Sequence, residues 1–105
     1  MEKKTIMLAC AAGMSTSLLV KKMLEAAKNQ GIDADIFAVS ATEVDDNISK
    51  KPIDVVMLGP QVRFLKDDMT KKLEPKGIPV AVIDMADYGM MKGDKVLATA
   101  LAMLG

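Results

Sequence analysis

The chain has 105 residues, with 14 basic and 14 acidic side chains that balance to a formal net charge of zero. This length predicts one domain over residues 1–105, and the balanced charge argues against non-specific nucleic-acid binding, which depends on a basic surplus. Because histidine is absent, the chain cannot supply a Ser–His or Cys–His pair, a phosphohistidine or an ordinary His-bearing zinc site.

The sequence predicts a cytoplasmic protein without direct membrane insertion. No apolar run approaches the roughly 20 residues of a membrane span, and the apolar stretch after Lys3 and Lys4 is too short for a signal peptide. A single cysteine, Cys10, excludes an intrachain disulfide and is typical of a cytosolic protein.

The first part of the chain predicts a strand, a helix and a second strand. Residues 5–9 are almost all apolar and predict a buried strand. Apolar residues at helical spacing then predict a helix that begins near residues 15–17 and stops at Gly31. Apolar and acidic residues alternate over residues 32–38, which predicts a strand at a partly wet edge of a sheet.

The middle of the chain predicts a short helix followed by a central strand. Ser40 and Glu43 have the spacing of a capping box and should open the helix. Residues 55–58 are apolar throughout, as in a central parallel strand. Gly59 then makes a turn, and Pro60 suits the first turn of the next helix.

The remaining elements complete an α/β fold. Apolar spacing over residues 62–73 predicts the third helix, residues 80–83 a fourth strand, residues 84–93 a loop, and residues 96–104 a final helix. Strands that alternate with helices predict an open four-stranded parallel sheet with helices on both faces. The order 2-1-3-4 fits best, because it places the wet strand at an edge and the apolar strands in the centre.

In such sheets ligands bind beyond the carboxyl ends of the strands, where the strand order reverses. Here that crevice lies between the first and third predicted strands. Cys10 ends the first strand, and Gly59, Pro60 and Gln61 follow the third. The only thiol of the chain therefore falls at the predicted binding site.

The segment after Cys10 predicts a phosphate-binding loop. It consists of Ala11, Ala12, Gly13, Met14, Ser15, Thr16 and Ser17. Small residues let the backbone curl and point successive N–H groups inward, which forms an anion-binding nest. The helix that follows directs its positive end at the same place. The alternative is that Cys10 is only a small buried hydrophobe that ends a strand.

Three known phosphoryl-transfer designs do not fit this loop. A Walker-type NTPase needs a lysine before its hydroxyl residue, and this loop reads GMS. A two-component receiver needs an aspartate after the third strand, where Leu58 stands, and acidic residues at the position of Cys10. A cysteine-based phosphatase needs an arginine where Thr16 stands, and the only arginine, Arg63, lies elsewhere in the sequence.

A loop without arginine should hold a phosphoryl group without accelerating its release to water. This is the behaviour of a carrier that waits for a partner to supply the missing groups. Two alternatives stay open: an enzyme like the low-molecular-weight tyrosine phosphatases on the same loop architecture, and a non-catalytic interaction module.

Three stretches resemble the enzyme IIB proteins of the sugar phosphotransferase system, lactose/cellobiose class. They are ACAAGMSTS at residues 9–17, LGPQ at residues 58–61, and the segment from Ile83 to Gly89. The resemblance extends over essentially the whole chain. Ala11 departs from it, because cellobiose-type loops more often have a serine there, and this removes one hydroxyl donor.

The resemblance implies a protein-N(π)-phosphohistidine–sugar phosphotransferase activity with a phosphocysteine intermediate. A phosphohistidine on enzyme IIA would donate to Cys10, and Cys10 to a sugar held by the membrane IIC transporter. The sugar would be a β-linked disaccharide such as cellobiose, chitobiose or lactose. Residues 11–17 would form the cradle, and Gly59, Pro60 and Gln61 would face it. We expect no cofactor or metal, and a monomer that exposes its loop to two partners in turn.

Three features near the predicted crevice have more than one interpretation. Tyr88 either contacts the phosphorylated loop or a partner, or is an ordinary half-buried aromatic. Asp84 and Asp87 lack a third metal ligand, so a helix cap or turn is the better interpretation. Four methionines near Cys10 would form either an adaptable docking rim or core filling: Met14, Met85, Met90 and Met91.

Overall fold

A four-stranded parallel sheet organises the molecule, as the computed structural model shows for the residues that it describes, 3–10 and 16–104. The strands lie in the order β2-β1-β3-β4. They are β1 (Lys4–Cys10), β2 (Ala34–Ser40), β3 (Val55–Leu58) and β4 (Val80–Val82). The predicted fold class and strand order are confirmed, whereas residues 11–15 of the predicted phosphate loop lie outside the described residues.

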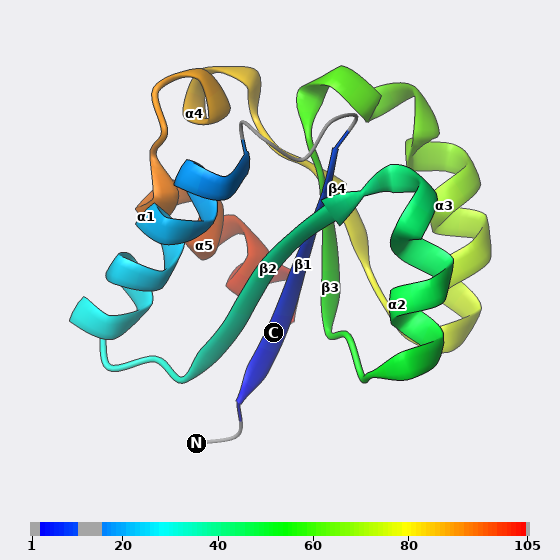
Figure 1. Cartoon of the computed structure of the whole chain (residues 1–105), viewed down its shortest axis with the longest axis horizontal. Helices are drawn as coiled ribbons and strands as arrows, with labels where there is room; N and C mark the ends of the chain where they lie inside the picture. The colour runs from blue at the N-terminus through cyan, green and yellow to red at the C-terminus, as the bar shows by residue number, and fades with distance from the viewer. Residues whose placement is uncertain (1–2, 11–15, 105) are drawn as a thin grey trace.

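Helices cover both faces of the sheet (Figure 1). One face carries α1 (Thr16–Asn29), the short α4 (Met85–Gly89) and α5 (Gly93–Met103). The other carries α2 (Val44–Lys50) and α3 (Lys66–Leu73), with the 3₁₀ helices η1 (Ala41–Glu43), η2 (Pro60–Leu65) and η3 (Glu74–Lys76). In the described part of the chain, no helix has the length and apolar character that a membrane crossing requires.

Each face of the sheet has its own hydrophobic core. In β1, Ile6 and Leu8 point into the core beneath α1 and α5, and Met7 and Ala9 into the core beneath α2 and α3. Successive side chains of a strand point to opposite faces, so a strand covered on both sides must be apolar at every position. This explains the continuous apolar runs that predicted β1 and β3.

The edge strand and its connection also follow the prediction. β2 lies at one edge of the sheet. At its end the capping box is present: the Ser40 hydroxyl accepts from the Thr42 N–H at 3.4 Å, and the Ser40 N–H donates to the Glu43 carboxylate at 3.2 Å. The cap opens a 3₁₀ turn that leads into α2, which ends at Lys50, two residues before Pro52.

The segment after β3 differs from the regular helix that was predicted. Pro60 begins η2, Val62 interrupts it with non-helical dihedral angles (φ −116°, ψ 24°), and α3 starts only at Lys66. The irregular turn buries both Pro60 and Val62, a spacing of two that a regular α-helix does not place on one face.

A short helix, α4, lies where a loop was predicted. The Asp84 carboxylate accepts from the N–H groups of Ala86 and Asp87 at 3.1 and 3.2 Å, so it caps the first turn. The prediction that Asp84 serves as a cap is confirmed. A helix of five residues is too short to show apolar periodicity, which is why the sequence pattern missed it.

Helix α5 lies against α1 at very close range. A Cβ built on Gly93 would lie 2.5 Å from the carbonyl carbon of Lys22 and 2.6 Å from the nitrogen of Met23. Only glycine permits this approach of two backbones. Just before it, Met91 has a left-handed φ of 53° and lies half-buried against the core beneath α1 and α5.

Candidate functional site

Cys10 is the last residue of the central strand β1, at the end of the sheet where all four strands have their carboxyl ends. β1 pairs with β2 on one side and with β3 on the other. The chain therefore adds β2 to one side of β1 and then crosses over to add β3 to the other side. Only 2% of the Cys10 surface is exposed. The structure therefore places the thiol at the predicted position where the strand order reverses.

The helix that follows the loop begins close to Cys10 in the sequence. α1 runs over 14 residues from Thr16, and its first turn contains no acidic residue. The positive end of its dipole is therefore not offset by a carboxylate within that turn. Thr16 and Ser17 of the predicted loop lie in this turn, whereas its residues 11–15 lie outside the described residues.

Gly59 lies directly against Cys10. Its N–H donates to the carbonyl oxygen of Ala9 at 2.8 Å, which joins the end of β3 to the residue before Cys10. A Cβ built on Gly59 would lie 3.3 Å from the Cβ of Cys10. The two residues therefore meet with no side chain of Gly59 between them.

Gln61 reaches the same place from η2. Its side-chain Oε1 lies 3.0 Å from the position that a Cβ on Gly59 would occupy. Pro60, between them, is buried and forms the first residue of η2. Gly59, Pro60 and Gln61 were predicted to face the cradle of residues 11–17, of which residues 11–15 lie outside the described residues. Within the described residues, Gly59 lies beside Cys10, the Gln61 Oε1 lies close to Gly59, and Pro60 is buried in the turn.

The only arginine also lies on η2. Arg63 is exposed and follows Gln61 by two residues. The parallel pairing of β1 with β3 brings the segments after both strands to one end of the sheet, so Arg63 lies at the same end as Cys10. The wide separation of the two residues along the chain gave no sign of this. No group of three or more cysteine or acidic side chains that could hold a metal ion occurs in the described ranges.

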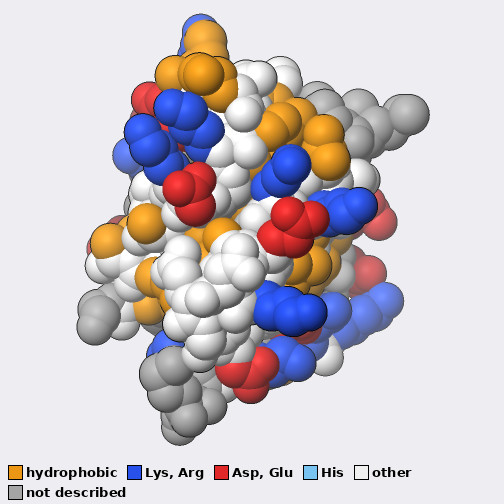
Figure 2. Space-filling view, turned by 90° about the vertical axis from the view of Figure 1, so that its left-hand side faces the viewer, with side chains coloured by type: hydrophobic (Ala, Val, Ile, Leu, Met, Phe, Trp, Pro, Cys, Tyr) orange, Lys and Arg blue, Asp and Glu red, His pale blue; other side chains and the backbone are white. Residues whose placement is uncertain are grey.

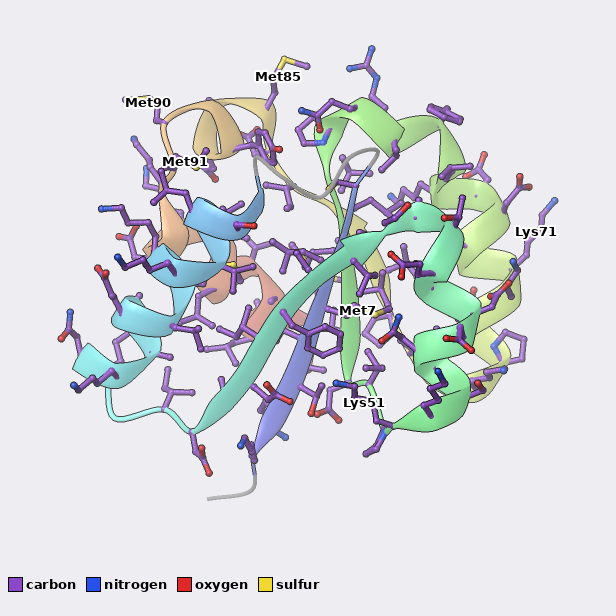
Figure 3. The ribbon with its side chains drawn as sticks, viewed as in Figure 1. Met7, Lys51, Lys71, Met85, Met90 and Met91 are labelled. Carbon is purple, nitrogen blue, oxygen red and sulfur yellow. The ribbon has the colours of Figure 1, made fainter. Side chains whose placement is uncertain are left out.

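Tyr88 does not lie on the surface. It belongs to α4, is 7% exposed, and its side chain contributes to the core beneath α1 and α5. Met91 is half-buried against the same core, whereas Met85 and Met90 are 62% and 67% exposed. Figure 3 shows these two side chains at the end of the molecule where the strands finish. The predicted methionine rim is therefore divided between surface and core.

Two exposed residues at this end were not predicted. Phe64 on η2 is 75% exposed, and Leu18 in the first turn of α1 is also exposed. With Met85 and Met90 they make up four of the five large hydrophobic side chains that are exposed within the described residues. Figure 2 shows hydrophobic side chains among lysines at the top of the face formed by α1, α4 and α5. We call these four residues the apolar rim.

Comparison with known proteins gives one consistent family. The family model described as "PTS system, Lactose/Cellobiose specific IIB subunit" matches residues 5–99. The cellobiose-specific EIIB component of Lactococcus lactis subsp. lactis is 57% identical over 104 residues, and the alignment covers 95% of each chain. The oligo-beta-mannoside-specific EIIB component of Bacillus subtilis is 45% identical over 101 residues, covering 96% of each.

Solved structures share the fold. The solution structure of the cellobiose-specific phosphotransferase IIB component from Borrelia burgdorferi superposes with a TM-score of 0.79 at 41% identity, covering 98% of this chain and 93% of that one. The lactose-specific IIB domain from Streptococcus pneumoniae superposes with a TM-score of 0.86, covering 99% of this chain and 100% of that one. At 19% identity, this second likeness concerns the fold alone.

Proposed function

The chain belongs to the lactose/cellobiose-specific IIB family of the phosphotransferase system, whose members are phosphotransferases, and on this premise we propose that Cys10 is its phosphoryl carrier. The observation that carries the proposal is the position of the thiol. Cys10 ends a central strand where the strand order reverses, with Gly59 against it and no acidic residue in the first turn of α1. This environment favours a negatively charged group on the sulfur.

The proposed reaction has two transfers. In the first, the sulfur of Cys10 attacks the phosphorus of a phosphohistidine on enzyme IIA, the N–P bond breaks, an S–P bond forms, and the thiol proton ends on the imidazole. In the second, a sugar hydroxyl oxygen attacks the same phosphorus, the S–P bond breaks, an O–P bond forms, and the hydroxyl proton returns to the sulfur. The chain is then ready for another cycle.

The cradle for the phosphoryl group would come from residues 11–17. Their backbone N–H groups and the positive end of α1 would face up to about two negative charges on the phosphoryl oxygens. The absence of arginine from this segment supports a holding role rather than hydrolysis. Gly59 would permit close approach from the side of β3.

The partners in this proposal are enzyme IIA and the membrane transporter IIC, which would meet the apolar rim in turn. Exposed apolar side chains around a site favour protein contact, and methionine adapts to more than one partner. A cytoplasmic monomer would suit this exchange. Relatives named for cellobiose and oligo-beta-mannoside favour a β-linked sugar as the acceptor, and a relative named for galactose, 57% identical over 104 residues, adds galactose to the candidates.

Intact mass spectrometry tests the proposal. The chain is incubated with phosphorylated enzyme IIA, and wild type is compared with Cys10→Ser. We expect wild type alone to gain the mass of one phosphoryl group. Equal labelling of both proteins, or no labelling of either, would contradict the proposal.

A parallel assay with p-nitrophenyl phosphate tests the phosphatase alternative. Because Arg63 lies at the same end of the sheet as Cys10, the assay includes Arg63→Gln. A carrier should show no appreciable turnover with any of the three proteins, wild type, Cys10→Ser or Arg63→Gln. Turnover by wild type that Cys10→Ser abolishes and Arg63→Gln reduces would establish a phosphatase instead.

A further inference from the structure

Gln61 is an exposed residue whose side-chain Oε1 lies close to Gly59, the glycine beside Cys10. Its Oε1 and the Cβ of Cys10 lie 3.0 and 3.3 Å from one point, the position of a Cβ on Gly59. The side-chain amide and Cys10 are therefore separated only by the space that Gly59 leaves empty.

The space beside Cys10, and not the backbone dihedral angles, accounts for the presence of glycine at position 59. Gly59 has φ −64° and ψ 152°, an extended conformation that any residue adopts. A Cβ there would meet Gln61 and Cys10 before any other atoms. What glycine provides is therefore room for the amide beside the thiol.

The backbone that carries Gln61 is held on both sides. Pro60 is buried and has a restricted φ. The Val62 N–H donates to the carbonyl oxygen of Gly59 at 3.0 Å and closes the turn around Gln61. The backbone of Gln61 is thus ordered before any phosphoryl group arrives, which lowers the cost of ordering its side chain.

A glutamine amide offers a donor and an acceptor on one planar group, and rotation about its last torsion exchanges them. We propose that Gln61 is a phosphoryl-binding residue, whose Nε2 donates a hydrogen bond to a phosphoryl oxygen on Cys10. This inference rests on the proposed function of Cys10. A neutral donor would stabilise the phosphorylated form without the charge by which a guanidinium promotes hydrolysis.

The test measures the equilibrium constant for phosphoryl transfer between purified enzyme IIA and the full chain. Gln61→Met keeps the length of the side chain and removes the amide, and we expect it to lower the constant about tenfold, as for one hydrogen bond to a charged group. Gln61→Glu should lower it further, because its carboxylate repels the phosphoryl group. Gly59→Ala, which fills the space of the amide, should resemble Gln61→Met.

Gln30→Glu is the matched control. Gln30 is exposed after the end of α1 and receives the same change of charge. Thermal midpoints of the two Gln61 variants should equal that of wild type, because the residue is exposed. The ³¹P chemical shift of the phosphorylated chain should move in Gln61→Met and stay fixed in Gln30→Glu.

Wild-type equilibrium constants in both Gln61 variants would overturn the inference while leaving the role of Cys10 intact. If wild type takes no phosphoryl group from enzyme IIA, the proposed function itself fails, and this inference fails with it. The two failures are therefore distinguishable in one experiment.

Discussion

At the scale of single residues, the surroundings of Cys10 set it apart from a cysteine that only fills a core. It ends a strand and lies beside Gly59, and the space that this glycine leaves empty is bordered by both Cys10 and the Oε1 of Gln61. Strand order predicted that Cys10 and residues 59–61 would lie at one crevice, and the family resemblance implied that residues 59–61 would face the cradle. Neither predicted that the Gln61 Oε1 lies close to Gly59, because this depends on the tight turn that begins at Pro60.

A bulky residue at Gly59 should impair the site more than the fold. Gly59→Val places methyl groups against Cys10 and Gln61, and overpacking of this kind costs about 1–3 kcal/mol in the free energy of unfolding. Urea denaturation measures that cost. The rate of labelling by phosphorylated enzyme IIA should fall beyond what the remaining folded fraction explains.

Gly89→Val is the control for this prediction, because a Cβ on Gly89 would meet no atom within 4 Å. It should label at the wild-type rate. Equal rates for Gly59→Val and Gly89→Val would show that the space beside Cys10 has no functional importance.

At the scale of elements, the regular helices and strands were predictable and the segments around the site were not. Continuous apolar runs predicted β1 and β3, and an apolar stripe at helical spacing predicted α1. η2 is irregular and α4 is short. Hydrogen bonds of single groups determine where such elements form, as the Asp84 cap of α4 shows. Periodicity cannot detect elements of this length.

The contact between α1 and α5 predicts a strong effect of a small substitution. In Gly93→Ala the new methyl would overlap backbone atoms of Lys22 and Met23, which cannot rotate away, so α5 must move. We expect the free energy of unfolding to fall by about 1–3 kcal/mol. Gly89→Ala serves as the control in the same urea titration, and a loss no larger than in that control would contradict the close contact.

The cap of α4 predicts a smaller effect. Asp84→Ala removes the carboxylate that accepts from two N–H groups and should lower the free energy of unfolding by about 1 kcal/mol. Asp87→Ala removes the same charge from the same helix and should cost less. Thermal unfolding compares the two variants, and equal midpoints would argue against the cap.

At the scale of the whole molecule, four of the five large hydrophobic side chains that are exposed in the described part of the chain gather at the end that holds Cys10. The sequence suggested Met85 and Met90 for this surface but missed Phe64 and Leu18. The exposure of Phe64 depends on the irregular turn of η2, and that of Leu18 on the rotation of α1, which helix periodicity alone does not relate to the site. The surface therefore becomes visible only in three dimensions.

The apolar rim predicts a variant that folds normally and docks poorly. Met85→Glu combined with Met90→Glu should lower the second-order rate of labelling by phosphorylated enzyme IIA about tenfold, because buried apolar anchors dominate protein contacts. The melting temperature should not change, since both side chains are exposed. Leu24→Glu changes an exposed residue of α1 outside the rim and is the control. A labelling rate in this control as low as that of the double variant would contradict the docking role.

The most direct test of the whole account locates the phosphoryl group in the labelled chain. Peptides from wild type labelled by enzyme IIA are sequenced by mass spectrometry, before and after the addition of membranes that contain IIC and a β-linked disaccharide. The account predicts one phosphoryl group on the sulfur of Cys10, lost from the chain as sugar phosphate appears. A phosphoryl group on Ser15, Thr16 or Ser17, or one on Cys10 that leaves only as inorganic phosphate, would contradict it.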